Sequence, residues 1–289
     1  MNLENRFHET KIHCKADFPY MVYRGNLPDY ITSYPVHWHK EMEIIFIISG
    51  RGTVTVQTTQ YVVKAGDIII ITPELLHSIK QLNDEKMEYF NILFDFLLLE
   101  DKNSYCFEKY LKGIFEHTKS IPICLRKNQE LTQLLTPYLE YLIANRKKKF
   151  SGDELMVKSN LFAILHNLCK NSDTVAESET KLDESYVKIK KVIYYVWEHY
   201  DEKISVDQAA KLINYSASYF SKLFHKLTGT SFTQYLKEYR LEVAANRLIN
   251  TDKTVTEISA ETGFCNLPYF TRAFEKKFGV TPNQYKKRR

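Results

Sequence analysis

The residues with the clearest capacity for chemistry are two basic ones, Lys222 and Arg272, which occupy equivalent positions in an internal repeat. Residues 218–235 (SYFSKLFHKLTGTSFTQY) align with residues 268–285 (PYFTRAFEKKFGVTPNQY) at an offset of 50. An exposed ammonium or guanidinium group can donate hydrogen bonds to O6 and N7 of guanine or to a phosphate oxygen. The pair therefore indicates contact with nucleic acid, if the surrounding elements present both side chains to solvent.

Each copy of the repeat is predicted to contain a short helix, a turn and a longer helix. Ser205 and Thr254 are predicted N-caps of the short helices, and Gly229 and Gly279 are predicted to end the long ones. This geometry places the second helix in a major groove. The apolar stripes leave an outward set: Ala217, Ser218, Ser221, Lys222 and His225 in the first copy, and Leu267, Pro268, Thr271, Arg272 and Glu275 in the second. Ser216 and Asn266 are expected to cap the long helices and to present backbone N–H groups to phosphate.

The second copy resembles the signature of the AraC-type transcription factors through nine spaced residues: Ile258, Gly263, Phe264, Tyr269, Phe270, Phe274, Gly279, Pro282 and Tyr285. The resemblance spans about 100 residues and implies two helix-turn-helix units joined by a long helix over 232–250. It also implies contacts with double-stranded DNA at a defined set: Ser218, Ser221, Lys222, Leu267, Pro268, Thr271 and Arg272. RNA polymerase is a second candidate partner. The competing interpretation is a helical bundle whose repeat is purely structural.

The first 100 residues show the period of β-strands. Residues 43–48 (EIIFII) and 53–58 (TVTVQT) flank Gly50-Arg51-Gly52, which predicts a hairpin. Further strand-like runs cover residues 68–72 and 88–94. Short strands at regular spacing favour a barrel or a sandwich.

Two spaced motifs in this part of the chain resemble those of the cupin barrel. They are His37-Trp38-His39-x3-Glu43-x6-Gly50 and Gly66-x6-Pro73-x3-His77, which together cover about 60 residues. In metal-binding cupins, residues at such positions converge on one cation. The resemblance therefore implies candidate ligands for Fe, Mn, Ni or Zn at His37, His39, Glu43 and His77. A metal-dependent cupin enzyme, an oxygenase or isomerase with an accessory DNA-binding domain, is the alternative function.

A sensor is favoured over an enzyme, because a barrel fused to a DNA-binding half is more useful as a sensor. Sensor cupins that resemble this one reuse the same positions to bind a small molecule. The predicted ligand-binding residues are Arg24, His37, Trp38, His39, Glu43 and His77. Trp38 could stack on a sugar ring, so the predicted effector is a carbohydrate. Histidines with a purely structural role are the remaining interpretation, and no catalytic residue or cofactor is predicted.

Two amphipathic helices are predicted after residue 128, where the apolar period changes. The apolar face of the first comprises Leu131, Leu134, Leu135, Tyr138, Leu139 and Leu142, and that of the second comprises Val157, Leu161, Ile164, Leu165 and Leu168. These leucine stripes are predicted to form the seam of a homodimer. Packing against the chain's own barrel is the alternative.

The sequence thus predicts a multidomain α+β protein. A cupin-like sensing barrel is expected over 1–100, a helical dimerisation region over 101–171, a polar linker over 172–182, and an all-α tandem helix-turn-helix domain over 183–289.

Composition limits the class of protein further. With 44% hydrophobic residues, 9 Gly and 8 Pro, the chain is neither disordered nor collagen-like. Its five cysteines are scattered without a C-x-x-C pair, which argues against a disulfide framework. No apolar run is long enough to cross a membrane, so we expect a cytoplasmic protein with no membrane partner. Residues 183–289 carry 18 Lys and Arg against 12 Asp and Glu, which fits DNA binding by that part.

Overall fold

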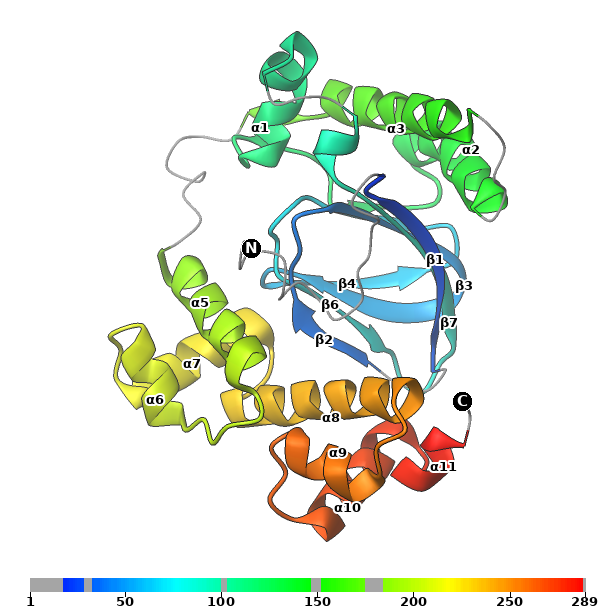
Figure 1. Ribbon diagram of the computed structural model, residues 1–289. Helices are drawn as coiled ribbons and strands as arrows, with labels where there is room; N and C mark the ends of the chain where they lie inside the picture. The colour runs from blue at the N-terminus through cyan, green and yellow to red at the C-terminus, as the bar shows by residue number, and fades with distance from the viewer. Residues whose placement is uncertain (1–17, 29–32, 100–102, 147–151, 175–183, 288–289) are drawn as a thin grey trace. The chain divides into compact units, whose positions relative to one another are not determined.

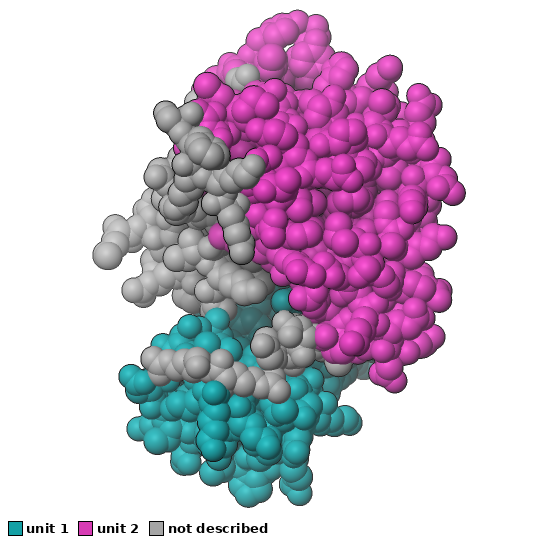
Figure 2. All heavy atoms as spheres, turned by 90° about the vertical axis from the view of Figure 1, so that its right-hand side faces the viewer, with its two compact units in different colours: residues 1–10, 29–37, 182–289 teal, residues 11–28, 38–181 magenta. Residues whose placement is uncertain are grey.

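The computed structural model describes residues 18–28, 33–99, 103–146, 152–174 and 184–287. The chain divides into two compact units, one built mainly from residues 38–181 and the other mainly from residues 182–289 (Figure 2). Most of the predicted linker, from residue 175 onward, lies outside the described residues.

Eight strands form one sheet, in which β3 is the central member. Strand β3 pairs with β4, β5, β6 and β7, and every one of these pairings is antiparallel. The strands of this sheet are β1 (Tyr20–Leu27), β2 (Ser33–His37), β3 (Met42–Val56), β4 (Thr59–Lys64), β5 (Ile68–Ile71), β6 (His77–Gln81), β7 (Met87–Phe94) and β9 (Cys124–Leu125). A separate pair is formed by β8 (Lys119–Ser120) and β10 (Asp173–Thr174). Figure 1 shows the strands curving around a common interior.

Strand β3 runs without a break through the predicted hairpin turn, so that prediction is wrong. Its first half pairs with β5 and β7, and its second half pairs with β4 and β6. Between the halves the register shifts after Ile47, and Gly50 adopts φ +73°. A side chain at Gly50 would collide with the backbone of Lys86, so the glycine lets one strand bend and serve both parts of the sheet.

A layer of helices covers one face of the sheet (Figure 1). After β7 come a 3-10 turn (Phe96–Leu98), a π-helical turn (Phe107–Leu111), α1 (Lys112–Phe115), α2 (Glu130–Asn145) and α3 (Asp153–Lys170). Alternate residues of β3 that face this layer, including Met42 and Ile44, share a buried cluster with the leucine stripes of α2 and α3. Leu135 is 0% exposed and Leu142 is 1% exposed within the single chain. The prediction that Leu135 and Leu142 form a dimer seam is therefore wrong, because the chain's own barrel already covers them, whereas Leu134 of the same stripe is 46% exposed.

Residues 184–287, the main part of the second unit, form helices joined by turns, with no strand among them. The helices are α5 (Glu184–His199), α6 (Val206–Leu212), α7 (Ala217–Thr228), α8 (Phe232–Asn250), α9 (Val255–Glu261), α10 (Leu267–Phe278) and α11 (Pro282–Lys286). Ser205 and Thr254 cap α6 and α9 in capping boxes, and Gly229 and Gly279 end α7 and α10 in the left-handed conformation. The predicted α+β organisation, a barrel with a helical pair followed by a tandem helix-turn-helix, is confirmed. Among the described helices, none has the length and apolar character needed to cross a membrane.

Candidate functional site

Helix α7, the second helix of the first helix-turn-helix, buries one face and exposes the other. Phe220 and Phe224 are 0% exposed and anchor it. The Ser216 hydroxyl oxygen accepts a hydrogen bond from the backbone N–H of Tyr219 at 3.3 Å, as expected of an N-cap. Ser218, Ser221 and Lys222 are exposed, although the Ser221 hydroxyl also donates to the Ala217 carbonyl. The lysine predicted to contact DNA is thus presented to solvent.

Helix α10 has the same arrangement in the second helix-turn-helix. The Asn266 side-chain oxygen accepts from the backbone N–H of Tyr269 at 2.8 Å. Leu267, Pro268 and Arg272 are exposed, whereas Thr271 is half-buried. The proline lies in the first turn, where its missing N–H is not needed. Both long helices therefore offer a capped N-terminus followed by an exposed basic side chain.

Sequence reasoning did not assign a role to two exposed aromatic residues on these helices. Tyr219 is 51% exposed and Tyr269 is 47% exposed, and they occupy equivalent positions of the repeat. The signal was present in the sequence, because Tyr-Phe-x-x-x-Phe occurs in both copies. The Phe packs in the core, and the Tyr beside it faces solvent next to the predicted DNA contacts.

Helix α8 connects the two helix-turn-helix units by specific hydrogen bonds. Arg240 donates to the backbone carbonyls of Tyr200 and Glu202, both at 2.6 Å. Gly263, in the turn between α9 and α10, lies against the same arginine. Burial lowers the pKa of the Arg240 guanidinium, but the group stays charged because the usual pKa of arginine is so high.

Further along α8, Arg247 donates to the Tyr200 hydroxyl at 2.7 Å and to the Glu261 carboxylate at 2.8 Å. The loop after α5, the helix α8 and the second helix-turn-helix thus share one polar network. This network ties the loop after α5 and helix α9 to α8.

In the first unit, two histidines meet one glutamate inside the barrel. Glu43 on β3 is 2% exposed, and its Oε2 lies 3.0 Å from Nε2 of His39 and 3.0 Å from Nε2 of His77. The two imidazole rings stand edge to face with centroids 4.9 Å apart. Because Met42 and Ile44 face the helix layer, the alternation of β3 directs Glu43 to the opposite, interior face.

Backbone carbonyls fix the orientation of these imidazoles. Nδ1 of His39 is 3.0 Å from the Glu41 carbonyl, and Nδ1 of His77 is 2.8 Å from the Leu75 carbonyl. A carbonyl oxygen can only accept, so each Nδ1 must carry the proton. In a neutral ring, Nε2 then presents a lone pair toward the carboxylate. A cation between them, or protonation of the rings, is needed to make this contact attractive.

The pKa of Glu43 reflects the same contacts. Burial by itself raises the pKa of this carboxyl group. Hydrogen bonds and charge interactions with His39 and His77 outweigh burial and hold the pKa well below its usual range. The carboxylate is therefore ionised at neutral pH and supplies a buried negative charge.

A metal ion would fit this group. His37 at the end of β2 also directs Nδ1 to a carbonyl, that of Pro35, at 2.9 Å. Ligand atoms of His37, His39, Glu43 and His77 all lie within 4.8 Å of one another. Metal–ligand bonds of about 2.0 to 2.2 Å require separations of this order, and three imidazoles with a carboxylate suit Zn, Fe, Ni or Mn.

The other two predicted ligand-binding residues take different positions. Trp38 is buried beside His39 in sequence, with 7% of its surface exposed. Arg24 is not brought to the histidines, because its guanidinium pairs with Glu88 at 2.6 Å and its side chain is 54% exposed. On β1 it shares a face with Tyr20 and Val22, which pack toward the helix layer rather than into the barrel.

Polar residues that sequence reasoning missed lie on the interior face of β7 and β1. Asn91 is 3% exposed and donates to the Tyr23 hydroxyl at 2.8 Å, while its side-chain oxygen is buried and has no hydrogen-bond partner among the residues that the structure describes. Cross-strand pairing places Asn91 opposite Ile45, two residues along β3 from Glu43. An asparagine within an apolar strand was the available signal, since burying an amide is costly unless something bonds to it.

Comparison with known proteins agrees with both domains. A model described as the AraC-like ligand binding domain matches residues 21–165, and one described as a helix-turn-helix domain matches residues 209–288. An uncharacterized HTH-type transcriptional regulator of Bacillus subtilis is 23% identical over 99% of this chain and 97% of its own length. The Msm operon regulatory protein of Streptococcus mutans is 26% identical over 99% of this chain and 98% of its own. A solved structure of ToxT from Vibrio cholerae has a TM-score of 0.50 at 14% identity, covering 93% of this chain and 98% of ToxT, which supports the fold alone.

Proposed function

Since the chain belongs to the AraC-type family of DNA-binding transcription regulators and has that family's ligand-binding domain, we propose that a small effector in the barrel controls its binding to an operator. The observation that carries the proposal is the pair of equivalent, exposed helices α7 and α10, each with a capped N-terminus and a basic side chain. An effector can switch the regulator only if it binds one conformation or assembly better than another.

The proposed DNA contacts divide into two kinds. Lys222 and Arg272 reach base edges or phosphates, and the N-termini capped by Ser216 and Asn266 direct backbone N–H groups to phosphate. The remaining proposed contacts are Ser218, Ser221, Leu267, Pro268 and Thr271. Tyr219 and Tyr269 extend the same surface.

The proposed effector site is the interior of the barrel around Glu43. His39, His77 and His37 would border it on one side, and Asn91 with Tyr23 on another. The side-chain oxygen of Asn91 would accept a hydrogen bond from a ligand hydroxyl, and Trp38, between two of these histidines in sequence, would supply a ring for stacking. This combination supports a polyhydroxylated effector such as a carbohydrate.

A metal ion is the second candidate ligand, favoured by the three imidazoles whose Nδ1 atoms face carbonyls. His37, His39, Glu43 and His77 would hold it, and the bound ion would supply a positive charge and open coordination positions for an effector. The same residues favour the competing function, a metal-dependent enzyme. Turnover of a substrate that stops in a His39→Ala, Glu43→Ala double variant would favour the enzyme. Loss of effector response with DNA binding intact would favour the regulator.

We further propose that the regulator acts as a homodimer and contacts RNA polymerase when bound to DNA. With Leu135 and Leu142 buried, the surface proposed for a second copy is the outer face of α2 and α3, where Leu134 is 46% exposed and Leu155 is 72% exposed. A Leu134→Glu, Leu155→Glu double variant should sediment as a monomer. A dimer unchanged by this variant would remove α2 and α3 from the interface.

The test of the proposed function is footprinting of the purified protein on fragments of its own genome at two salt concentrations. A shared motif with two half-sites is expected, and phosphate-driven background should fade at the higher salt. Lys222→Ala and Arg272→Ala should weaken motif binding, with about 1 to 3 kcal/mol for each lost bidentate base contact. Lys170→Ala on α3 serves as the control for loss of one charge. Binding without any motif would contradict the proposal.

A further inference from the structure

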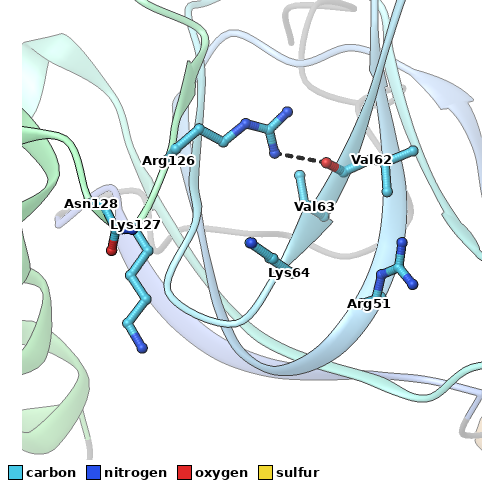
Figure 3. A pocket seen from close by; sticks show the side chains of 7 residues that line it. All are labelled: Arg51, Val62, Val63, Lys64, Arg126, Lys127 and Asn128. Carbon is cyan, nitrogen blue, oxygen red and sulfur yellow. Dashed lines mark hydrogen bonds between the residues drawn. The ribbon is translucent and has the colours of Figure 1, made fainter.

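A hollow of about 360 Å3 opens beside strand β4 in the first unit, away from the histidines (Figure 3). One wall is the β3–β4 ladder, and the other is the segment between β9 and α2. Its lining residues are Arg51, Val62, Val63, Lys64, Arg126, Lys127 and Asn128. Four of these seven carry a positive charge.

Two of the cations are placed against each other by the sheet itself. Arg51 and Lys64 are direct cross-strand partners in the antiparallel β3–β4 pair. Like charges at such positions repel and destabilise the pair. Arg51 has a carboxylate neighbour in Glu85 at 3.3 Å on the exposed rim. A bound anion would relieve the remaining repulsion.

The walls of the hollow are held together by one buried carboxylate. Asp67 is 0% exposed and accepts hydrogen bonds from Arg126 Nη1 at 2.8 Å, from the backbone N–H of Lys127 at 3.1 Å and from that of Lys64 at 3.2 Å. Arg126 also donates to the Val62 carbonyl at 2.7 Å, the bond drawn in Figure 3. Asp67 is therefore committed to fixing both walls.

The side chain of Lys127 occupies the space beside Gly66, which has no side chain of its own. A Cβ on Gly66 would lie 2.6 Å from Cδ of Lys127, and Gly66 has φ +89°. The lysine stem packs on this glycine. Among the described residues, neither the Lys64 nor the Lys127 ammonium group has a carboxylate within salt-bridge distance. Two unpaired positive charges thus remain on a preformed concave surface.

We propose that this hollow is a second ligand site, which binds a small molecule carrying a phosphate group or several carboxylates. Its volume is in the range of small-molecule pockets, and fixed walls favour a compact ligand over a flexible polymer. Arg126 and Lys127 lie just before Glu130, the first residue of α2. Occupancy is thereby linked directly to the helix layer. The site is separate from the effector site in the barrel, so either can exist without the other.

The test is calorimetric titration of the full chain with inorganic pyrophosphate and with citrate, in chloride buffers of matched ionic strength. Saturable binding of one of these probes at one site per chain is expected. A Lys64→Gln, Lys127→Gln double variant should weaken it by about tenfold or more, because charge-assisted contacts are lost. A Lys158→Gln, Lys170→Gln variant, with the same charge removed on α3, should bind like the unaltered protein. Circular dichroism and thermal melting verify that both variants fold.

Three results would overturn the proposal. The first is that neither probe binds the unaltered protein at millimolar concentration. The second is equal weakening in both double variants, which would indicate attraction to net charge only. The third is that the Lys64→Gln, Lys127→Gln variant binds random duplex DNA more weakly than the unaltered protein but binds both probes equally well. That result would assign the hollow to nucleic acid. The footprinting motif does not depend on any of these outcomes, so this proposal and the proposed function fail separately.

Discussion

Because Gly263 has no side chain, the turn between α9 and α10 can pack against Arg240 and the Tyr200 carbonyl. Gly263 has φ +77°, and a Cβ there would lie 2.8 Å from the Tyr200 carbonyl oxygen and 2.8 Å from Cζ of Arg240. Gly263→Ala should therefore lower the free energy of unfolding by about 3 kcal/mol or more, because backbone strain and a collision add together. Denaturant unfolding of the full chain measures the change.

The matched control for this change is Gly229→Ala. Gly229 has nearly the same φ, +70°, but nothing lies within 4 Å of the added Cβ. Its cost should be only the strain of the left-handed conformation, about 1 to 2 kcal/mol. Equal losses in the two variants would mean that the contact among Gly263, Arg240 and Tyr200 does not contribute to stability.

The histidine cluster makes a second prediction at the residue scale. Protein loaded with Zn, Ni or Mn and then dialysed should retain about one ion per chain, and His77→Ala should reduce affinity by more than about tenfold. Elemental analysis and a competing chelator measure both quantities. His166→Ala, on the exposed side of α3, should have no effect. If the unaltered protein retains no ion, an organic ligand alone remains for this site.

Individual residues show which parts of the proposed effector site can be predicted from the sequence. His39, Glu43 and His77 were identified through the resemblance to the two cupin motifs, and the structure brings them together. Arg24 was assigned to the ligand from its charge alone, and its strand directs it to the other face. Asn91 was overlooked because its role depends on which strand it faces. Cross-strand neighbours are set by pairing between distant segments, which local patterns do not encode.

At the scale of elements, local signals were most reliable where capping residues stand at both ends of a helix. The long helix predicted over 232–250 is α8, with Ser231 at its N-terminus, and the predicted caps of α6, α7, α9 and α10 are all present. The hairpin predicted at Gly50-Arg51-Gly52 is instead a bend within β3. Glycines are typical of both a hairpin turn and a bend within a strand. Only the pairing of β3 with β4 to β7 shows which of the two is present.

The leucine stripe of α2 leads to a prediction about the free energy of unfolding. Leu135→Ala should cost about 2 to 5 kcal/mol of unfolding free energy, because the side chain is in the core between the barrel and α2. The adjacent Leu134→Ala should change stability by no more than about 0.5 kcal/mol, because Leu134 is exposed. Denaturant melts of the two variants provide the comparison. A stable Leu135→Ala protein that sediments as a monomer would restore the stripe as a dimer seam.

At the scale of the whole molecule, the two functions have separate structural bases. The barrel unit buries its apolar surface against its own helices and keeps charged groups inside. The helical unit presents Lys222 on α7 and Arg272 on α10, and α8 connects its two helix-turn-helix units. Regulation requires both in one chain, so that ligand binding and DNA binding share one equilibrium.

The rigidity of α8 predicts how the protein reads spacing on DNA. Helix-turn-helix pairs on one face of DNA bind half-sites about 10 to 10.5 base pairs apart. Inserting about 5 base pairs turns one half-site to the opposite face, and inserting about 10 restores its direction but doubles the distance. Both insertions should reduce affinity to that of a single half-site, because Arg240 and Arg247 tie α8 to both units.

Fluorescence anisotropy with duplexes derived from the footprinted motif measures this dependence. Arg240→Ala removes the hydrogen bonds to the Tyr200 and Glu202 carbonyls without changing any side chain of α7 or α10. It should lower the affinity for the natural spacing and reduce the difference in affinity between the natural and the altered spacings. Lys203→Ala, a nearby exposed residue, is the control. Equal affinity for all spacings in the unaltered protein would mean that the two units move independently and that α8 acts as a tether. The buried contacts of α8 with both helix-turn-helix units argue for the fixed arrangement.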